Sequence, residues 1–272
     1  FSDINFASIQ YARRFEKLGN FSAAIQYHNY GKFDYADEAG HLDGSTFSAS
    51  DYAFIIGWGR QLDNHFSIGA NIKFAGNQYE HDNSFALAVD VAGSYQTESG
   101  WMFSLAARNI GRELYRNYDG FRNSMPFKMQ VGMAKMLEHL PFMFIVVYDN
   151  IQKWDLMYDD PIDLEGNTDA LTGEVNKKKG FDKFIDNAFR HIVLGGELYI
   201  GKNLIIRGGF NYGRRQDLKI PGKKGAVGFS YGLSIKIKQL NISYSRSEMH
   251  IVGSPNYISV TTNLSRFVKK NK

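Results

Sequence analysis

The 272-residue sequence contains no cysteine, only 5 prolines and only 3 tryptophans. The absence of cysteine excludes a disulfide framework and a thiolate metal site. No stretch approaches the roughly 18 consecutive apolar residues of a transmembrane helix, which excludes a helical membrane span. The mean hydropathy of −0.35 is still compatible with a membrane β-barrel, because the lumen-facing residues of such a barrel are polar.

The abundant residues favour β-strands and tight turns. The chain has 27 glycines, 21 phenylalanines and 16 tyrosines. Acidic and basic residues are interspersed at a net charge of +4, apart from the lysines at 177–179 and the tail 269–272. We interpret these lysines as solvated, and we expect no nucleic-acid partner.

Apolar and polar residues alternate along most of the chain. In residues 66–74, for example, Phe66, Ile68 and Ile72 lie on one side of the pattern and Asn71 and Lys73 on the other. This period of two predicts about thirteen strands. Their expected bounds are 3–15, 20–33, 46–60, 65–79, 84–96, 101–111, 126–136, 141–153, 189–200, 203–214, 225–237, 239–248 and 256–268.

The expected strand lengths and connections point to an all-β, transmembrane antiparallel β-barrel of a bacterial outer membrane. Crossing a bilayer at a tilt takes roughly 9–11 residues, more than the usual soluble strand. Short turns alternate with longer loops at 34–45, 112–125, 154–188 and 215–224, as in barrels with short periplasmic turns and long external loops. Residues 154–188 form the largest external loop.

Because bacterial barrels have even strand numbers, we expect a single barrel domain over 1–272, with about 14 strands in the parent protein and its N-terminal part missing here. Aromatic residues near strand ends predict girdles at the membrane boundaries. Residues 181–190 have helical apolar spacing and predict either a short amphipathic helix or only the approach to the next strand. Inward charges at Lys73, Asp90, Arg108, Glu197, Arg207 and Lys236 predict pairing across the lumen or, alternatively, a selectivity ring.

Polar loop residues offer no catalytic constellation. Asp37 and Asp43 flank His41, while Asp159 and Asp160 follow Asp155, and either group has the oxygen ligands for Ca²⁺. Solvated loop charge is the simpler interpretation, because the histidines form no metal-binding pair and no nucleophile–base–orienter set emerges. We therefore expect no enzyme, no cofactor and no metal site.

Several motifs resemble the PorQ family of outer-membrane barrels of the type IX secretion system. They are IQYHNYGKFD at 25–34, FSASDYAF at 47–54, RNIGR at 108–112, PF at 126–127, LEHLPF at 137–142, QKWDL at 152–156 and YDDP at 158–161. The resemblance implies a barrel of the long-chain fatty acid transporter superfamily with about 14 strands. It also implies an attachment-complex scaffold that tethers a PorZ-like surface protein. This scaffold would work with the PorU sortase and the PorV barrel, which attach secreted proteins to anionic lipopolysaccharide.

On this resemblance the external loops are the docking surface. Aromatic side chains are good interface anchors. The candidate partner-binding residues are Trp154, Tyr158, Asp159, Asp160, Tyr115, Tyr118 and Phe121. For Trp154 the alternative is a rim residue that anchors the barrel at the bilayer surface. Two other functions stay open: a channel for hydrophobic small molecules, and a hydrolase acting at the barrel rim.

Overall fold

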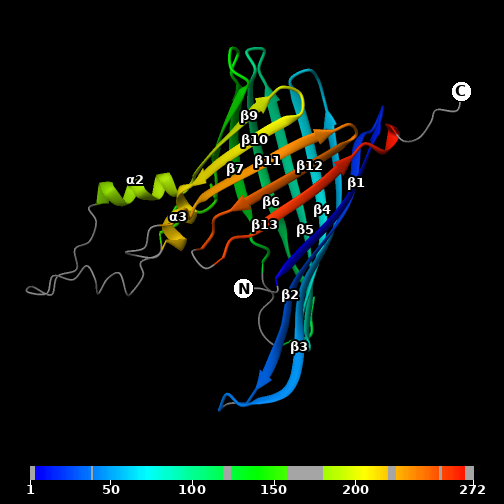
Figure 1. Cartoon of the computed structure of the whole chain (residues 1–272), viewed down its shortest axis with the longest axis vertical. Coiled ribbons are helices and arrows are strands. Elements are labelled where there is room, and N and C mark those ends of the chain that lie inside the picture. Colours follow the sequence, from blue (N-terminus) through cyan, green and yellow to red (C-terminus); the bar gives the residue numbers. More distant parts are fainter. Residues whose placement is uncertain are drawn as a thin grey trace, which may run out of the picture. The chain divides into compact units, whose positions relative to one another are not determined.

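A computed structural model describes residues 4–37, 39–118, 124–157, 180–219, 225–250 and 253–266. These residues form one antiparallel sheet of thirteen strands, each hydrogen-bonded to the next in chain order (Figure 1). The prediction of thirteen antiparallel strands is therefore confirmed. The order runs from β1 to β13, and the described residues contain no ladder between these two strands, so the sheet is not closed by them.

The chain divides into two compact units, Phe1–Gln130 and Val131–Lys272. The strands of the first unit are β1 (Asn5–Phe15), β2 (Gly19–Ala36), β3 (Leu42–Gln61), β4 (Phe66–Tyr79), β5 (Asp82–Gln96) and β6 (Trp101–Arg116). β7 (Lys128–Met136) contains the boundary. The second unit holds β8 (Phe142–Tyr148), β9 (Ile192–Ile200), β10 (Leu204–Asn211), β11 (Phe229–Ile237), β12 (Leu240–Ser247) and β13 (Asn256–Thr262).

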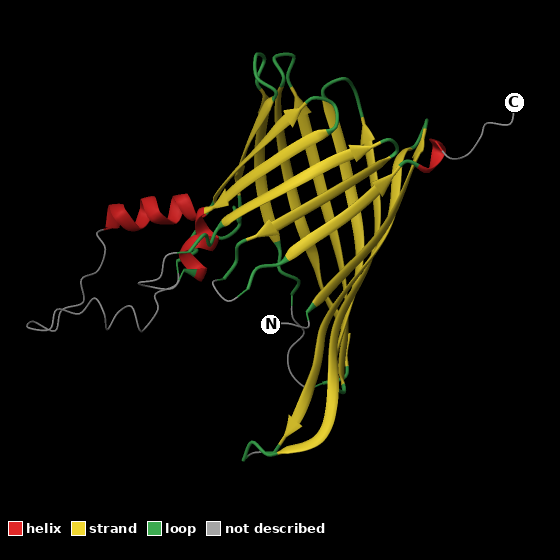
Figure 2. Cartoon of the chain, viewed as in Figure 1, coloured by secondary structure: helices red, strands yellow, loops and turns green. Residues whose placement is uncertain are grey.

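Helices occur in the second unit. They are α2 (Gly180–Arg190), α3 (Tyr212–Leu218) and a 3₁₀ turn at Leu264–Arg266, shown in red in Figure 2. Of the two alternatives for 181–190, the structure has the helix. The strand predicted over 203–214 ends early, at Asn211, because α3 begins at Tyr212. The first part of the loop predicted over 215–224 is therefore helix. Asn211 caps this helix by accepting a hydrogen bond from the Arg214 amide at 2.9 Å.

Each unit presents one apolar face of its sheet to the outside. In the first unit, Ala23, Ile56, Ile72, Val89 and Ile110 lie opposite one another in a cross-strand row. In the second unit the corresponding row is Leu198, Ile206, Leu233, Tyr244 and Ile258. Most of these large side chains are exposed; Ile56, for example, is 42% exposed. A sheet in water would bury such a face.

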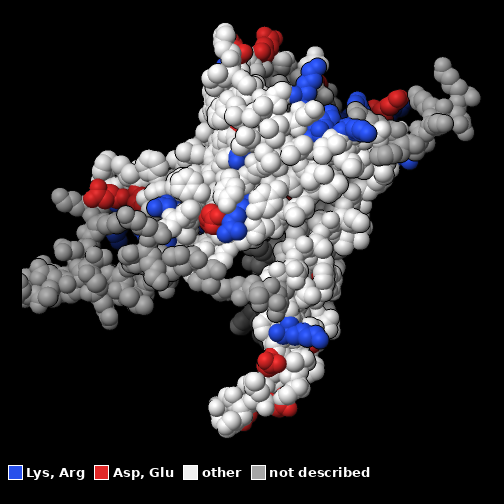
Figure 3. Space-filling model, viewed as in Figure 1, with Lys and Arg blue, Asp and Glu red and all other residues white. Residues whose placement is uncertain are grey.

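The opposite face of each unit is polar and better buried. In the first unit Ser22, Gly57, Asn71 and Asp90 share a row. A Cβ at Gly57 would lie 2.4 Å from the Ser22 hydroxyl oxygen, so a larger residue there would displace that side chain. Figure 3 shows few charged atoms between the strand ends on the side of β11, β12 and β13 turned to the viewer.

Four of the six predicted inward charges form ion pairs, but each pair joins neighbouring strands of the sheet rather than reaching across a lumen. The Lys73 ammonium lies 2.7 Å from the Asp90 carboxylate, which also accepts a hydrogen bond from the Asn109 amide at 2.9 Å. In the second unit the Arg207 guanidinium lies 2.7 Å from Glu197 and donates a further hydrogen bond to Ser234. Oppositely charged groups that meet at these distances form local ion pairs rather than a ring of one sign.

Strand lengths depart from the expected 9–15 residues in both directions. β2 and β3 have 18 and 20 residues, whereas β8 and β13 have only 7 each. Most of the loop expected at 34–45 is therefore strand. The strand expected at 141–153 ends at Tyr148. The segment expected as one large loop over 154–188 contains most of α2, and residues 158–179 lie outside the described part of the chain.

Candidate partner-binding surfaces

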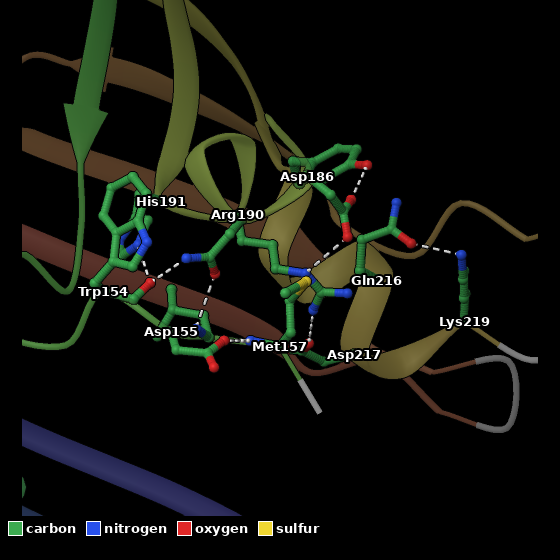
Figure 4. Close-up of polar contacts among 12 residues, drawn as sticks. Trp154, Asp155, Met157, Asp186, Arg190, His191, Gln216, Asp217 and Lys219 are labelled. Carbon is green, nitrogen blue, oxygen red and sulfur yellow. Dashed lines mark hydrogen bonds and ion pairs between the residues drawn. The ribbon is translucent and has the colours of Figure 1, made fainter. Parts of the chain in front are cut away.

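Two structures extend beyond the strands at the ends that carry the longer connections. In the second unit, residues 149–157, α2, His191 and α3 pack together, and we name this assembly the platform (Figure 4). In the first unit, β2 and β3 continue past their neighbours as a two-stranded ribbon over residues 30–48, which we name the arm. Figure 1 shows the arm as the blue ends of these two strands.

His191 is the buried centre of the platform. Its side chain is fully buried, at 0% exposure. One ring nitrogen lies 2.6 Å from the Asp149 carbonyl oxygen and the other lies 3.0 Å from that of Trp154. The ring is stacked between Tyr148 and Trp154, with centroid distances of 4.9 and 5.6 Å.

Asn187 joins α2 to the segment that follows β8. It is 2% exposed. Its side-chain NH₂ donates to the Trp154 carbonyl, and its side-chain oxygen accepts from the Leu156 amide at 2.9 Å. The side-chain oxygen and nitrogen of Asn187 are therefore both hydrogen-bonded, as is usual for buried polar groups, and they hold the irregular segment around residues 154–156.

An ion-pair network connects α2 to α3. Arg190 lies between Asp217 of α3, at 2.7 Å, and Asp186 of its own helix, at 3.4 Å (Figure 4). The Tyr212 hydroxyl donates to Asp186 at 2.7 Å. Burial, reinforced by this contact with a carboxylate, raises the pKa of Tyr212. The helices approach closely at Gly213, where a Cβ would lie 2.5 Å from the Arg190 carbonyl oxygen.

Trp154, the first of the predicted docking residues, is a partly exposed member of the platform. Its backbone carbonyl is held by His191 and Asn187. Its ring contacts Phe184 of α2 at a centroid distance of 5.3 Å and remains 49% exposed. Since the ring has a fixed position and an open face, Trp154 has the properties of an interface anchor and equally those of a rim residue.

Two of the candidate docking residues from the expected loop at 112–125, Tyr115 and Tyr118, lie among the described residues and point to different partners. Tyr115 is a strand residue, exposed beside its cross-strand partner Phe85. Tyr118 instead donates its hydroxyl to Glu113 at 3.0 Å, with the Arg116 guanidinium over its ring. Phe121, Tyr158, Asp159 and Asp160 lie outside the described residues.

The arm begins where the neighbouring ladders end. The ladder between β1 and β2 stops at Asn29, and the ladder between β3 and β4 stops at Ala49. Beyond these residues the ladder joins only β2 and β3, apart from one hydrogen bond of 3.3 Å from the Glu80 amide to the Ser48 carbonyl. A bulge lies next to Gly31, whose φ is +91°. The Gly31 amide donates to the Asn29 side chain at 2.9 Å, which fixes the bulge.

Aromatic stacking and an aspartate turn stabilise the arm. The Phe47 ring contacts Phe33 at 5.3 Å and Tyr35 at 5.0 Å between centroids. At the tip, one Asp37 carboxylate oxygen accepts from the His41 amide at 2.8 Å, and the other lies 3.1 Å from the His41 ring. Asp37 and His41 thus hold a turn together, while Asp43 accepts from Ser45.

A cavity of about 380 Å³ lies within the first unit, and polar residues line much of it. His28, Asp51 and Glu113 are among them. Asp51 accepts hydrogen bonds from the hydroxyls of Tyr30 and Tyr79, both at 2.6 Å. The described residues contain no group of three histidine or carboxylate side chains arranged to hold a metal.

Sequence reasoning missed His191, Asn187 and Arg190, which hold the platform together. The prediction for 181–190 used the apolar spacing alone. The sequence did hold a signal, because polar residues also recur there at helical spacing and indicate a helix face that contacts polar groups. These residues are Lys183, Asp186, Asn187 and Arg190.

Comparison of the chain with protein-family models and with curated proteins finds no match. Among the described helices, none has the length and apolar character that crossing a membrane requires.

Proposed function

We propose that this chain is a non-catalytic scaffold barrel of the bacterial outer membrane, belonging to the type IX secretion system. In this role it anchors a PorZ-like surface protein in the attachment complex. That complex, with the PorU sortase and the PorV barrel, links secreted proteins to anionic lipopolysaccharide. The proposal joins the motif resemblance to two features of the structure, the exposed apolar sheet faces and the extensions beyond the strands.

The reversed polarity of the sheet supports a membrane location. Large apolar residues such as Ile56 and Ile235 are exposed, whereas Asp90 and Ser234 on the opposite faces are buried. Hydrocarbon solvates the first kind of face, and a polar lumen suits the second. In lipid, every backbone polar group needs an internal partner. Antiparallel ladders supply these partners between neighbouring strands, although the outer edges of β1 and β13 have no ladder among the described residues.

The connections support an orientation with the arm and the platform at the cell surface. In the first unit the turns 16–18, 62–65 and 97–100 are short and lie at the strand ends opposite the arm. In the second unit the short connections 137–141, 201–203 and 238–239 lie opposite the platform. Outer-membrane barrels place short turns in the periplasm and longer segments outside.

The arm is the observation that carries the scaffold proposal. A two-stranded ribbon that stands alone is only marginally stable in water, and its edges offer unpaired backbone groups to another chain. The motifs at 25–34 and 47–54 pair with each other and extend from the sheet into the arm. The motif at 152–156 includes Trp154 of the platform. Three resemblance motifs therefore reach regions that closing a barrel does not require.

The channel for hydrophobic molecules receives less support. Paired charges occupy the polar face at Lys73 and Asp90 and again at Arg207 and Glu197. An apolar ligand moving along such a face would desolvate these groups at a cost. These contacts favour a packed or wet interior over an apolar conduit.

Two adjacent isoleucines provide a matched test of the membrane location. Ile56 lies on the apolar face and Ile55 on the polar face near Lys73. We expect Ile56→Asp to lower the free energy of unfolding in lipid vesicles by about 2 kcal/mol, and Ile55→Asp to lower it much less. Equal effects of the two substitutions, or a protein that stays monodisperse without detergent, would contradict the membrane location.

The scaffold role is tested by shortening the arm. Lys32 pairs with Ser48, so residues 33–47 can be replaced by an Asn-Gly turn that closes the hairpin at this pair. We expect the shortened protein to fold in the outer membrane but to lose its surface partner in pull-downs analysed by mass spectrometry. Glu98→Ala, at a short turn, is the control. If the shortened protein recovers the surface partner as well as the full-length protein does, the arm does not bind that partner.

A further inference from the structure

Helix α2 has its polar side packed against the protein and its apolar side exposed. Phe181, Phe184, Ile185 and Phe189 are 72%, 55%, 39% and 51% exposed. The residues on the other side, Lys183, Asp186, Asn187 and Arg190, are partly or fully buried. A surface helix in water has the opposite arrangement.

The polar contacts prevent α2 from rolling over to hide its phenylalanines. Asn187 binds two backbone groups, and Arg190 and Asp186 bind α3. Rotation about the helix axis would break these contacts and leave buried polar groups without partners, at about 1–3 kcal/mol for each group. The apolar side is therefore held outward and needs an apolar environment.

Aromatic contacts connect this side to the ends of the strands. The Phe189 ring lies 5.9 Å from the ring of Tyr212, two residues beyond Phe210 of β10. Phe210 in turn contacts Phe229 of β11 at 4.7 Å. Toward the other end of α2, Phe184 contacts Trp154. Figure 2 shows α2 leaving the strand ends of its unit and running away from the sheet.

We propose that α2 is an interfacial anchor, whose phenylalanines insert into the boundary between headgroups and acyl chains of the outer leaflet. This inference rests on the proposed membrane location. A bilayer is favoured over a protein as the occupant because the exposed side of α2 continues into the exposed apolar face of the strands. Amphipathic helices with bulky apolar residues bind membrane interfaces in this manner, and Trp154 is of the type that occupies the boundary.

Because the chain contains no cysteine, a single spin label can be placed without background. We suggest Phe184→Cys on the exposed side, Lys183→Cys on the packed side, and Ile206→Cys on the apolar face of β10. Each labelled protein is reconstituted alone in phosphatidylcholine vesicles. Collision of the label with oxygen, which enters the bilayer, is compared with collision with a water-soluble nickel chelate. Circular dichroism establishes that each variant keeps its β-sheet.

We expect the ratio of oxygen to nickel collisions to be several-fold higher at position 184 than at 183, and similar at 184 and 206. A low ratio at 184 with a high ratio at 206 would overturn the anchor while leaving the membrane location intact, and would assign this side of α2 to a protein partner. Low ratios at both 184 and 206 would overturn both proposals.

Discussion

The two units have the same two-faced sheet but strands of different length. The strands β1–β6 have between 11 and 20 residues, whereas β8–β13 have between 7 and 9. Both sets carry an exposed apolar face. In the first unit the ladder simply continues into the arm, while in the second the chain turns helical next to the last ladder residues. In the proposed membrane location, a bilayer would constrain only the segment within it, and the arm and the platform would lie beyond that segment.

The units also differ in the contacts that hold the arm and the platform. The arm is held by the ring contacts of Phe47 and by the turn at Asp37, and none of its described residues is buried. The platform has the fully buried His191, the buried Asn187 and a network of ion pairs. The comparison indicates a deformable extension in one unit and a rigid one in the other.

The sharpest test of the comparison concerns the ion pairs of the two polar faces. The side chains of Lys73 and Asp90 are 21% and 12% exposed, against 40% and 17% for Arg207 and Glu197. Lys73→Met leaves a buried carboxylate without its cation, and we expect it to cost about 3 kcal/mol of unfolding free energy. Arg207→Met should cost about 1 kcal/mol, because solvent screens the more exposed pair. Urea unfolding in vesicles measures both values.

Lys236→Met serves as the control for this series. Lys236 is exposed on the polar face of β11 and makes no ion pair among the described residues, so its replacement should change the unfolding free energy little. Equal losses for Lys73→Met and Arg207→Met would show that burial does not distinguish the two units.

A smaller effect distinguishes the platform from the arm. Asn187→Ala removes two hydrogen bonds and should cost about 2 kcal/mol of local stability. Phe47→Ala removes the aromatic contacts of the arm and should cost about 1 kcal/mol. Hydrogen exchange of the Leu156 amide reports the first, and exchange of the arm amides reports the second.

Asn187→Asp separates the two bonds of the amide, because a carboxylate still accepts from the Leu156 amide but no longer donates to the Trp154 carbonyl. It should preserve protection of the Leu156 amide better than Asn187→Ala does.

If Phe47→Ala unfolds the whole sheet, the arm is not an independent extension.

The smallest expected effect is a dependence on pH. Hydrogen bonds from the backbone amide and the ring of His41 hold the pKa of Asp37 below its ordinary value of 3.8. Their contribution to the turn is complete above that value and is lost as the pH falls through the lowered pKa. In the second unit, Arg246 and then Ser254 hold the pKa of Glu248 below 4.5. NMR titration of both carboxyls should show both pKa values below their ordinary values, and added salt should raise the pKa of Glu248, because its exposed charge pair with Arg246 is screened. An unchanged pKa of Glu248 at high salt would contradict the contribution of this pair.

The number, type and order of the strands could be predicted from alternation, because a residue period of two is a local property. Their ends could not be predicted to the residue. Alternation at Phe33, Tyr35 and Phe47 does not reveal that β2 and β3 continue without neighbours. The residues 212–218 have no marked apolar period, and their helix depends on the cap from Asn211 and on the approach at Gly213 to Arg190.

The candidate site was predicted only in part. Trp154 was identified by residue type, and α2 was one of two alternatives for 181–190. The histidine that holds Trp154 in place lies 37 residues further along the chain, so no local pattern connects them.

The sequence by itself determined that this chain forms long antiparallel strands with one apolar and one polar face, because the side chains of a strand alternate between its faces. Only the tertiary structure decided which apolar residues stay exposed, where the arm leaves the sheet, and how His191 and Asn187 hold the platform together. These features arise from contacts between residues distant in the chain, which satisfy buried polar groups that a local pattern does not record.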